Sequence, residues 1–544
     1  MDAVIKVPAP VNDVVRSYAP GSAERARLEV TLDELSNTDP IELTATIDGV
    51  SKPASGDAFE VTMPSEHSHV LGHAAHATRT DATQSIDAAL AAAPGWAELG
   101  FEQRAAVFLR AADLLAGPWR DTLNVTTMLG QGKTVQQAEI DAACELIDFW
   151  RFNVAFARQI LADQPISSLG VWNRADYRPL EGFVYAITPF NFTSIAGNLP
   201  TSPALMGNVV IWKPSPTQQY AAHFIMRLLE AAGLPPGVIN MLPGDGLEVS
   251  EVALRHRDLA GIHFTGSTKT FQHLWQSVGA NIAGYRTYPR LVGETGGKDF
   301  VLAHTGANPD VVRTALVRGA FEYSGQKCSA ASRAYIARSV WNTMGEELIE
   351  ATENLSVGDV RDLSNFTSAV IDQRAFTKHA EAIARARNST DATIIAGGET
   401  DDREGWYVRP TLIISDNPRN DIFRTEYFGP ILGIHVYDDT DFDAILDEVD
   451  QASPYGLTGA IISDDRWAID RASRRLRHAA GNFYVNDKPT GAVVGQQPFG
   501  GSRASGTNDK AGSPLNLLRW TSARSIKETF VPPTDHRYPH MEAN

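Results

Sequence analysis

Cysteine is the scarcest residue of this chain: only Cys144 and Cys328 occur in 544 residues. Two thiols cannot form a disulfide framework, which excludes small disulfide-stabilised secreted proteins and predicts a reducing compartment. We take the cytoplasm as that compartment, although an organelle matrix has the same redox state. The chain also lacks zinc-type Cys/His spacings and a His-Glu-x-x-His motif, so we expect no metal site.

Further absences exclude other classes of protein. No run of apolar residues approaches the length needed to span a bilayer, and the N-terminus lacks the apolar core of a signal peptide. An excess of positive charge is also missing, since 48 Lys and Arg residues stand against 65 Asp and Glu residues for a net charge of −17. Such an acidic surface disfavours nucleic acid and anionic membranes as partners.

The chain is too long for one hydrophobic core, so we expect more than one domain. From about residue 100 onward, short apolar runs alternate with segments of helical periodicity. The runs are 183–187, 208–212, 238–242 and 261–264, followed by 300–303, 334–337, 432–436 and 459–462. This β-α-β rhythm predicts an α/β protein with two domains, each built on a parallel sheet that is covered on both faces.

The boundary between these domains is predicted near residue 290. Residues 1–50 are less patterned and are interpreted as an extension wrapped on the surface. One long helix is predicted over 136–161, and Cys144 in its interior is interpreted as a small buried hydrophobe. The neighbouring Glu145 is interpreted as a carboxylate on the surface of that helix, and a position near the path of the water molecule is the alternative.

Cys328 has a different setting, between small residues and directly after Lys327. A cysteine attacks as its thiolate, and a neighbouring cation or a run of backbone N–H groups lowers the thiol pKa. Taken alone, this cysteine fits a packed core position equally well, because free cysteine is among the most buried residue types.

Polar groups follow several predicted strands, at the edge where open α/β sheets bind ligands. Asn191 lies between two aromatic residues and is either a donor to an oxyanion or a turn residue. Lys213 and Ser215 follow the next strand, where they either bond ribose hydroxyls or are simply solvated.

Glycine-containing turns add further candidates. Gly266, Ser267 and Thr268 open a helix with free N–H groups, which suits either a phosphate or an ordinary N-cap. Glu294 lies in a glycine-rich turn, where it is either a general base or an exposed acid. The segment 244–249 lacks the third glycine of the dinucleotide fingerprint and is interpreted as a turn.

Seven motifs in one order resemble the aldehyde dehydrogenase superfamily over about residues 55–525. They are Pro189-Phe190-Asn191, Trp212-Lys213-Pro214-Ser215, Phe264-Thr265-Gly266-Ser267, Glu294-Thr295-Gly296-Gly297-Lys298, Gly325-Gln326-Lys327-Cys328, Glu426-Tyr427-Phe428-Gly429-Pro430 and Pro498-Phe499-Gly500-Gly501. The resemblance implies a variant Rossmann domain that binds NAD without the ordinary fingerprint, a catalytic domain and a β-arm for oligomerisation. The implied boundaries are 51–165 with 183–290 for the NAD-binding domain, 291–506 for the catalytic domain, and 166–182 with 507–544 for the arm and C-terminal tail.

The resemblance also implies a role for each matching residue. Cys328 would be the nucleophile, Asn191 and the backbone N–H of Cys328 would hold the oxyanion, and Glu294 would activate water. The implied cofactor contacts are Lys213 and Ser215 with the adenosine ribose, Gly266, Ser267 and Thr268 with the pyrophosphate, Glu426 with the nicotinamide ribose and Phe428 with the nicotinamide ring. Ser215 stands where many NAD-specific members have glutamate, which leaves use of NADP open.

Within the superfamily, residues 490–508 are most similar to the L-glutamate γ-semialdehyde dehydrogenases. That similarity implies that Ser329 and the backbone N–H groups of Gly491 and Ala492 anchor the α-carboxylate of the substrate. Phe192 and Phe499 would flank its aliphatic chain, and Lys327 would add positive charge beside the nucleophile. Many relatives have serine at position 492, so alanine keeps the backbone donor of this contact and loses a hydroxyl.

The implied reaction is the second step of proline catabolism, the NAD-dependent oxidation of glutamate semialdehyde to glutamate through a thiohemiacetal and a thioester. A homodimer or a dimer of dimers, and a functional link to a separate proline dehydrogenase, are implied as well. Three alternatives stay open: a dehydrogenase of another acidic semialdehyde such as succinate semialdehyde, a non-catalytic binding protein on this scaffold, and a thiol hydrolase. The last has no histidine in a motif that would activate the cysteine.

Overall fold

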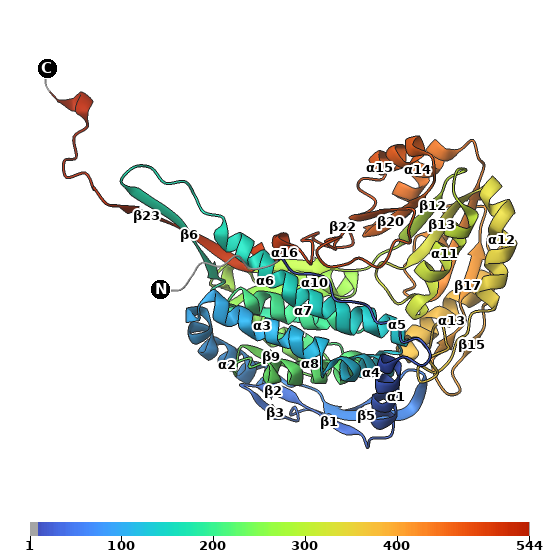
Figure 1. Ribbon diagram of the computed structural model, residues 1–544, viewed down its shortest axis with the longest axis horizontal. Helices are drawn as coiled ribbons and strands as arrows, with labels where there is room; N and C mark the ends of the chain where they lie inside the picture. The colour runs from blue at the N-terminus through green and yellow to red at the C-terminus, as the bar shows by residue number, and fades with distance from the viewer. Residues whose placement is uncertain (1–8, 543–544) are drawn as a thin grey trace.

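Figure 1 shows the computed structural model, which describes residues 9–542 as two sheet-centred domains and a projecting arm. The first sheet contains, in spatial order, β11 (Arg290–Glu294), β10 (Leu259–Thr265), β7 (Phe183–Thr188), β8 (Val209–Pro214), β9 (Ile239–Met241), β2 (Ala45–Ile47) and β3 (Val50–Lys52). The second contains β14 (Thr393–Ala396), β17 (Thr411–Ile414), β18 (Ile431–Tyr437), β13 (Ala331–Ala337), β12 (Asp299–Ala303), β20 (Thr458–Ile462) and β21 (Asn482–Val485). The predicted α/β class with two mainly parallel sheets is confirmed; only β2, β3 and β14, at sheet edges, pair antiparallel.

Side chains of the first sheet alternate between two cores, because successive residues of a strand point to opposite faces. On β7, Phe183 and Tyr185 enter one core, whereas Val184 and Ala186 enter the other. The first core is closed by α2 (Arg79–Glu98), α9 (Leu247–Arg255) and α10 (Thr268–Ala280). The second is closed by α3 (Phe101–Ala116), α6 (Leu146–Ala162), α7 (Thr193–Leu205) and α8 (Gln219–Ala231). Burial on both faces explains why these strands are continuous apolar runs in the sequence.

The remaining elements complete the second domain and one edge of the first. The helices around the second sheet are α11 (Pro309–Phe321), α12 (Arg338–Glu353), α13 (Gln373–Arg387), α14 (Phe442–Gln451) and α15 (Arg466–Arg475). Near the N-terminus lie α1 (Ala23–Ser36), α4 (Arg120–Gln131) and a small sheet of β1 (Ile41–Leu43), β5 (Glu66–Ala75) and β4 (Ala58–Met63). Two short ribbons pair β15 (Thr400–Asp401) with β16 (Tyr407–Val408) and β19 (Tyr455–Gly456) with β22 (Ser502–Arg503).

Two of the predicted domain boundaries need correction. β2 pairs with β9 and β3 pairs with β2, so the first sheet begins at residue 45 and the N-terminal extension ends earlier than residue 50. Asp48 and Gly49 join these strands with φ angles of 52° and 72°, which is the conformation of a tight two-residue hairpin turn. β11 pairs with β10, so the first sheet continues to Glu294 and the chain crosses to the second sheet over residues 295–298.

The helix predicted over 136–161 is continuous but not regular. α5 (Val135–Ala138) leads into a π-helical segment (Glu139–Glu145) and then into α6. Single π-helical turns within α-helices occur frequently at functional sites. Here the segment contacts the first turn of α7, because the Asp141 carboxylate accepts hydrogen bonds from the backbone N–H groups of Thr193 and Ser194, both at 2.9 Å.

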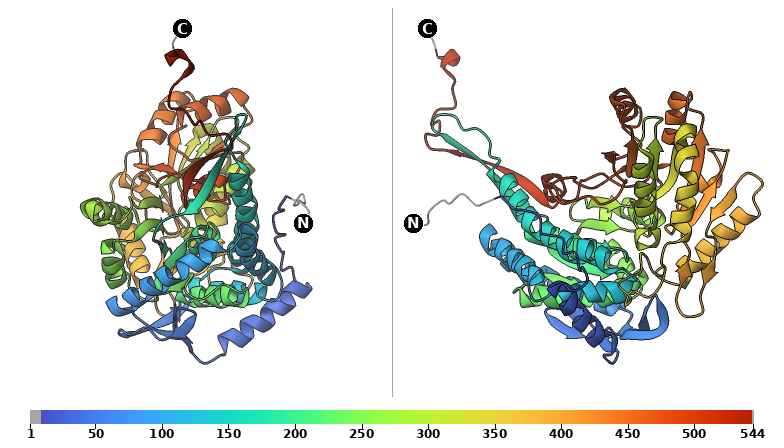
Figure 2. Two further views of the ribbon diagram at one scale, coloured as in Figure 1. Left: turned by 90° about the vertical axis from the view of Figure 1, so that its left-hand side faces the viewer. Right: turned by 45° about the vertical axis from the view of Figure 1, so that its right-hand side comes forward.

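The arm consists of β6 (Val171–Pro179) and β23 (Thr521–Thr529), which pair antiparallel within one chain. It projects away from both domains (Figure 2). α16 (Pro514–Leu518) and Trp520 pack into the core of the first domain, so the predicted arm segment 507–544 is too long at its start. Within residues 9–542, no helix is both long and apolar enough to cross a membrane.

Candidate active site

The carboxyl ends of the parallel strands of the first sheet meet at one edge, as the fold requires. Asn191 follows β7, Ser215 follows β8, Gly266 follows β10, and Glu294 is the last residue of β11. A cavity of about 650 Å³ lies over this edge and reaches residues of the second domain. Its walls include eight of the predicted site residues: Asn191, Lys213, Ser215, Gly266, Ser267, Cys328, Glu426 and Phe428.

The outer part of this first cavity is formed by Lys213 and by the start of α10. Lys213 is buried, and burial lowers its pKa to about 7. α10 begins beside it, and the Ser267 side chain accepts a hydrogen bond from the Thr270 backbone at 3.1 Å. Ser267 and Thr270 both line the cavity, because residues three apart share a helix face, whereas Thr268 does not. Thr268, which was predicted to contact the pyrophosphate together with Gly266 and Ser267, is not among the residues that line this cavity.

The inner part of the first cavity is bounded by the Glu426 carboxylate and the Phe428 ring. Glu426 accepts a hydrogen bond from the backbone N–H of Gly297 at 2.8 Å, and burial raises its pKa. Phe428 has a left-handed backbone with φ of 58° and packs edge-on against Phe190, with ring centroids 5.7 Å apart. A side chain at Gly296 would overlap the Glu426 carboxylate, which explains the glycine there.

Several residues of this cavity were missed from the sequence. The turn at 245–247, set aside because it lacks a glycine, forms part of the wall, and so do Arg374 and Lys378 of α13. The signal that could have identified the turn at 245–247 was its position directly after a strand. No sequence pattern indicated Arg374 and Lys378, because α13 belongs to the other domain.

Cys328 lies in the loop between α11 and β13, directly after an unusual stretch of backbone. Tyr323, Ser324 and Gly325 have φ angles of 53°, 49° and 64°, a conformation that costs energy for residues other than glycine and is concentrated at functional sites. Ser324 is held by hydrogen bonds with the Thr367 hydroxyl at 2.7 and 3.0 Å. These bonds fix the turn that points the thiol toward the gap between the domains.

The charge around Cys328 differs from the prediction. Burial raises the pKa of the thiol, and the carboxylates of Glu294, Asp299 and Glu426 raise it further. Lys327 does not offset them, because its ammonium group is paired with Glu322 at 3.0 Å. The pKa of the Cys328 thiol is therefore raised and not lowered, although Lys327 is its neighbour in the sequence.

A second cavity of about 660 Å³ lies on the other side of Cys328. All seven residues expected around the nucleophile on the substrate side line it: Phe192, Lys327, Cys328, Ser329, Gly491, Ala492 and Phe499. The Ser329 hydroxyl is hydrogen-bonded to that of Thr490 at 2.8 Å, which ties the nucleophile loop to the loop of Gly491. Cys328 lines both cavities, so it lies where the two cavities meet.

Asn191 is buried beside the nucleophile loop. Its side-chain amide donates a hydrogen bond to the backbone carbonyl of Gln326 at 3.0 Å, which fixes the orientation of the NH2 group. The residue is therefore neither exposed nor part of a simple surface turn. A fixed amide next to a nucleophile is the arrangement that stabilises a developing oxyanion.

Two carboxylates lie near the thiol, and the sequence singled out only one of them for catalysis. Burial raises the pKa of Glu294 to about 8, and burial with the charge of Asp141 raises that of Glu145 to about 8. Both line a small cavity of about 40 Å³ with Phe499, and Glu145 also lines the second cavity. The interpretation of Glu145 as a helix-surface carboxylate was wrong, because the π-helical segment turns it inward, where it accepts a hydrogen bond from Ser194 at 3.0 Å.

The sequence of the chain is similar to those of named proteins from other organisms. A probable delta-1-pyrroline-5-carboxylate dehydrogenase of Schizosaccharomyces pombe is 47% identical over 542 residues, covering 99% of this chain and 99% of the relative. A relative from Mus musculus, named delta-1-pyrroline-5-carboxylate dehydrogenase, mitochondrial, is 47% identical over 532 residues, covering 98% of this chain and 94% of the relative.

A solved structure is similar along the whole chain. The crystal structure of the delta-pyrroline-5-carboxylate dehydrogenase from Mycobacterium tuberculosis bound with NAD has a TM-score of 0.97 and 64% identity, and the match covers 100% of both chains. The aldehyde dehydrogenase family model matches residues 51–526, which include every residue of the two cavities and all strands of the two large sheets except β2 and the first residue of β3. On sequence and on fold, this chain belongs to the aldehyde dehydrogenase family.

Proposed function

We propose that this protein oxidises L-glutamate γ-semialdehyde, the open form of 1-pyrroline-5-carboxylate, to L-glutamate with NAD+, in the second step of proline catabolism. The observation that carries the proposal is the position of Cys328, which opens onto a nucleotide-sized cavity on one side and a polar cavity on the other. The names of the relatives and the NAD bound by the Mycobacterium tuberculosis enzyme support the same assignment.

The first cavity fits NAD+ in the chemistry of its donors. Lys213 and Ser215 would hold the adenosine ribose, the N–H groups at the start of α10 the pyrophosphate, and Glu426 the nicotinamide ribose. When bound, NAD+ supplies the oxidising power of the reaction. Since Ser215 presents a hydroxyl and not a carboxylate, we further propose that the ribose site tolerates NADP.

The chain's own groups account for the covalent steps. The Cys328 thiol loses its proton to solvent water and its sulfur bonds to the aldehyde carbon as the π bond of the carbonyl breaks. The resulting oxyanion is held by the Asn191 amide and the backbone N–H of Cys328. After oxidation the substrate is a thioester on Cys328. Glu294 then accepts a proton from a water molecule that attacks the acyl carbon, the C–S bond breaks, and glutamate leaves while the thiol is restored.

The second cavity supports an acidic substrate. The Ser329 hydroxyl and the backbone N–H groups of Gly491 and Ala492 would hold the α-carboxylate, and the rings of Phe192 and Phe499 would flank the aliphatic chain. The cavity also carries Arg318 and Lys488, two cations that no motif had indicated.

Assembly and location are proposed from the arm and from the two free cysteines. We propose that the arm joins two copies into a homodimer, that dimers can associate further, and that a separate proline dehydrogenase supplies the substrate. A reducing compartment suits the two free cysteines. The cytoplasm remains our proposal for it, and the mouse relative is named as mitochondrial.

A substrate panel tests the proposed function. NADH formation should be much faster with pyrroline-5-carboxylate than with succinate semialdehyde or propanal, because only the first carries an α-amino acid head. Cys328→Ala should abolish turnover while retaining NAD binding, and Cys144→Ala, the matched control, should retain turnover. Faster oxidation of succinate semialdehyde would favour the alternative acidic substrate, and turnover by Cys328→Ala would refute the mechanism.

A further inference from the structure

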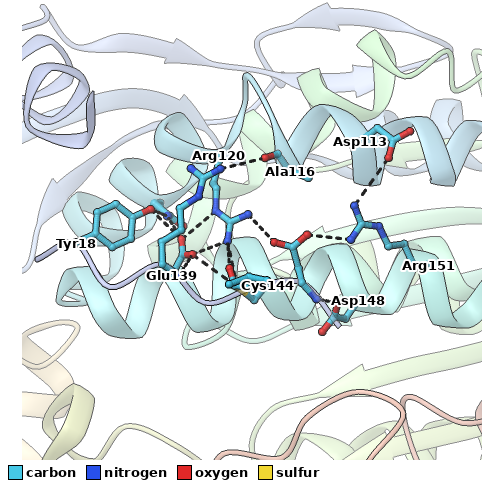
Figure 3. A network of polar contacts seen from close by, with 12 residues as sticks. Tyr18, Asp113, Ala116, Arg120, Glu139, Cys144, Asp148 and Arg151 are labelled. Carbon is cyan, nitrogen blue, oxygen red and sulfur yellow. Dashed lines mark hydrogen bonds and ion pairs between the residues drawn. The ribbon is translucent and has the colours of Figure 1, made fainter. Parts of the chain in front are cut away.

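The N-terminal segment, residues 9–18, has no regular secondary structure but is held firmly against the first domain. Its anchor is a buried ion network around Arg120 of α4, which Figure 3 shows with Glu139 and Tyr18 directed toward one another. Arg120 pairs with Glu139 of the π-helical segment at 2.5 Å and with Asp13 at 2.7 Å, and its side chain is 2% exposed. The network also includes Cys144, whose sulfur lies 3.2 Å from Arg120, so this cysteine is in polar and not apolar surroundings.

Backbone groups of the segment take part in the same network. The Tyr18 hydroxyl and the backbone N–H of Arg16 donate to the Glu139 carboxylate at 2.9 and 2.8 Å. The backbone carbonyl of Val14 accepts from Arg120 at 3.0 Å. Because these partners are buried charges that need their hydrogen bonds, the position of the segment is closely fixed.

Asn12 extends this anchored segment to the second cavity. Its side-chain NH2 group donates to the Asp148 carboxylate of α6 and to the backbone carbonyl of Val494, both at 2.8 Å. Its side-chain oxygen accepts from the Gln496 side chain at 2.9 Å. The side-chain amide of Asn12 therefore joins α6 to the loop around Val494, a residue that lies 482 positions after Asn12 in the sequence.

That loop, residues 490–497, has no helix or strand and carries the backbone groups of Gly491 and Ala492 on the wall of the second cavity. Its other close contact with the first domain is at Gly495, where φ is 80° and a side chain would overlap the Phe152 ring of α6. The loop can present two N–H groups to an anion only if its backbone is held in one conformation.

We propose that Asn12 is a positioning residue for substrate recognition: it holds loop 490–497 so that Gly491 and Ala492 face the carboxylate of the substrate. The inference rests on the proposed function, because it assigns that loop to the carboxylate. Asn12 itself does not line either cavity, so its effect passes through the backbone of the loop.

The test compares an anionic with an uncharged aldehyde. Asn12→Ala removes hydrogen bonds to the loop that are together worth roughly tenfold in binding, so the KM for glutamate semialdehyde should rise by about that factor. The kcat, the KM for NAD+ and the kcat/KM for propanal should stay within about twofold of the wild type. Binding of L-glutamate, measured by calorimetry, should weaken by the same factor as the KM.

Asn37→Ala is the matched control, because Asn37 lies in the same part of the chain and its side chain bonds only to Asp33 of its own helix. It should leave every constant unchanged. If Asn12→Ala does not fold, Gln496→Ala, which removes one of the three bonds and leaves Asp148 paired, should give a smaller change of the same kind.

Two outcomes would overturn the proposal. An equal loss for propanal and glutamate semialdehyde would make Asn12 a general stabiliser, and unchanged constants would remove its role altogether. A wild-type enzyme with no preference for glutamate semialdehyde over propanal would instead refute the proposed function, so the two failures are distinguishable.

Discussion

Cys328 and Glu294 share a site in which burial raises the pKa of both groups. For the thiol this disfavours the thiolate, which is the form that attacks. For the carboxylate it means that the basic form, which is needed to accept a proton from water, is populated only as the pH approaches 8. Both groups act in their deprotonated form, and burial disfavours that form in each of them. Strongly shifted pKa values of this kind are common among catalytic groups.

The first prediction concerns the base. Because only ionised Glu294 accepts a proton, wild-type deacylation should accelerate as the pH rises through about 8 and then level off. Glu294→Gln should slow deacylation by roughly 100-fold or more, lose this pH dependence and accumulate acyl-enzyme. Single-turnover kinetics and intact-protein mass spectrometry measure these effects.

Glu102→Gln makes the same chemical change at an exposed carboxylate and should retain the wild-type profile. Glu145 is the informative comparison, because burial gives it a pKa of about 8 as well. Should Glu294→Gln keep the profile and Glu145→Gln lose it, the base would be Glu145.

At the scale of elements, the π-helical segment decides where several charges point. Glu139 faces the N-terminal segment, Asp141 holds the start of α7, and Glu145 faces the small cavity. Three buried acids from seven residues require partners, and Arg120 and Lys133 supply them for the first two. Buried pairs of this kind are weak evidence for net stability but are costly to break from one side.

The second prediction tests that cost. Arg120→Met leaves the Glu139 carboxylate buried without its cation, so the free energy of unfolding should fall by about 3–5 kcal/mol. Arg474→Met removes an exposed ion pair with Asp470 and should change the free energy of unfolding by less than about 1 kcal/mol. Urea unfolding followed by circular dichroism measures both, and equal small losses would show that the network does not stabilise the fold.

The same segment shows why sequence periodicity succeeded only in part. The apolar spacing over 136–161 correctly predicted a helix, because α6 buries one face against α3 and α7. The extra residue of a π turn leaves no mark in a pattern of 3.6 residues, so Glu145 was assigned to the wrong face. The hairpin of β2 and β3 had a local signal, Asp48-Gly49, which is typical of a tight turn.

At the scale of the whole molecule, the arm of β6 and β23 is the proposed site of assembly. A two-stranded ribbon is marginally stable in isolation, and this one bears the exposed side chains of Trp172, Phe530 and Val531. The ends of β6 and β23 project well beyond both domains (Figure 1). We therefore expect a second copy to cover the ribbon.

The third prediction follows from that geometry. A chain ending at Trp520 lacks β23 and should sediment as a monomer, whereas a chain ending at Phe530 keeps the full pairing of β6 with β23 and should remain a dimer. Analytical ultracentrifugation distinguishes the two masses. Dimers of the shorter chain would place the interface outside the arm.

The sequence by itself determined the fold class, the positions of the central strands of both sheets and the motifs that line the two cavities. Strands buried on both faces must be apolar along their length, and strand-end motifs such as Trp212-Lys213-Pro214-Ser215 mark the edge where a ligand binds. Local chemistry of this kind is written in consecutive residues, and every predicted site residue except Glu294 and Thr268 lines one of the two large cavities.

Only the tertiary structure decided which charges meet. The inward turn of Glu145 and the bridge from Asn12 to Val494 depend on segments brought together by packing. The pairing of Lys327 with Glu322, five residues earlier, depends on the left-handed turn that lies between them. Burial then sets the pKa values of Cys328 and Glu294, and burial is a property of the assembled domains. Electrostatics between distant segments therefore cannot be read from a chain until its fold places them in contact.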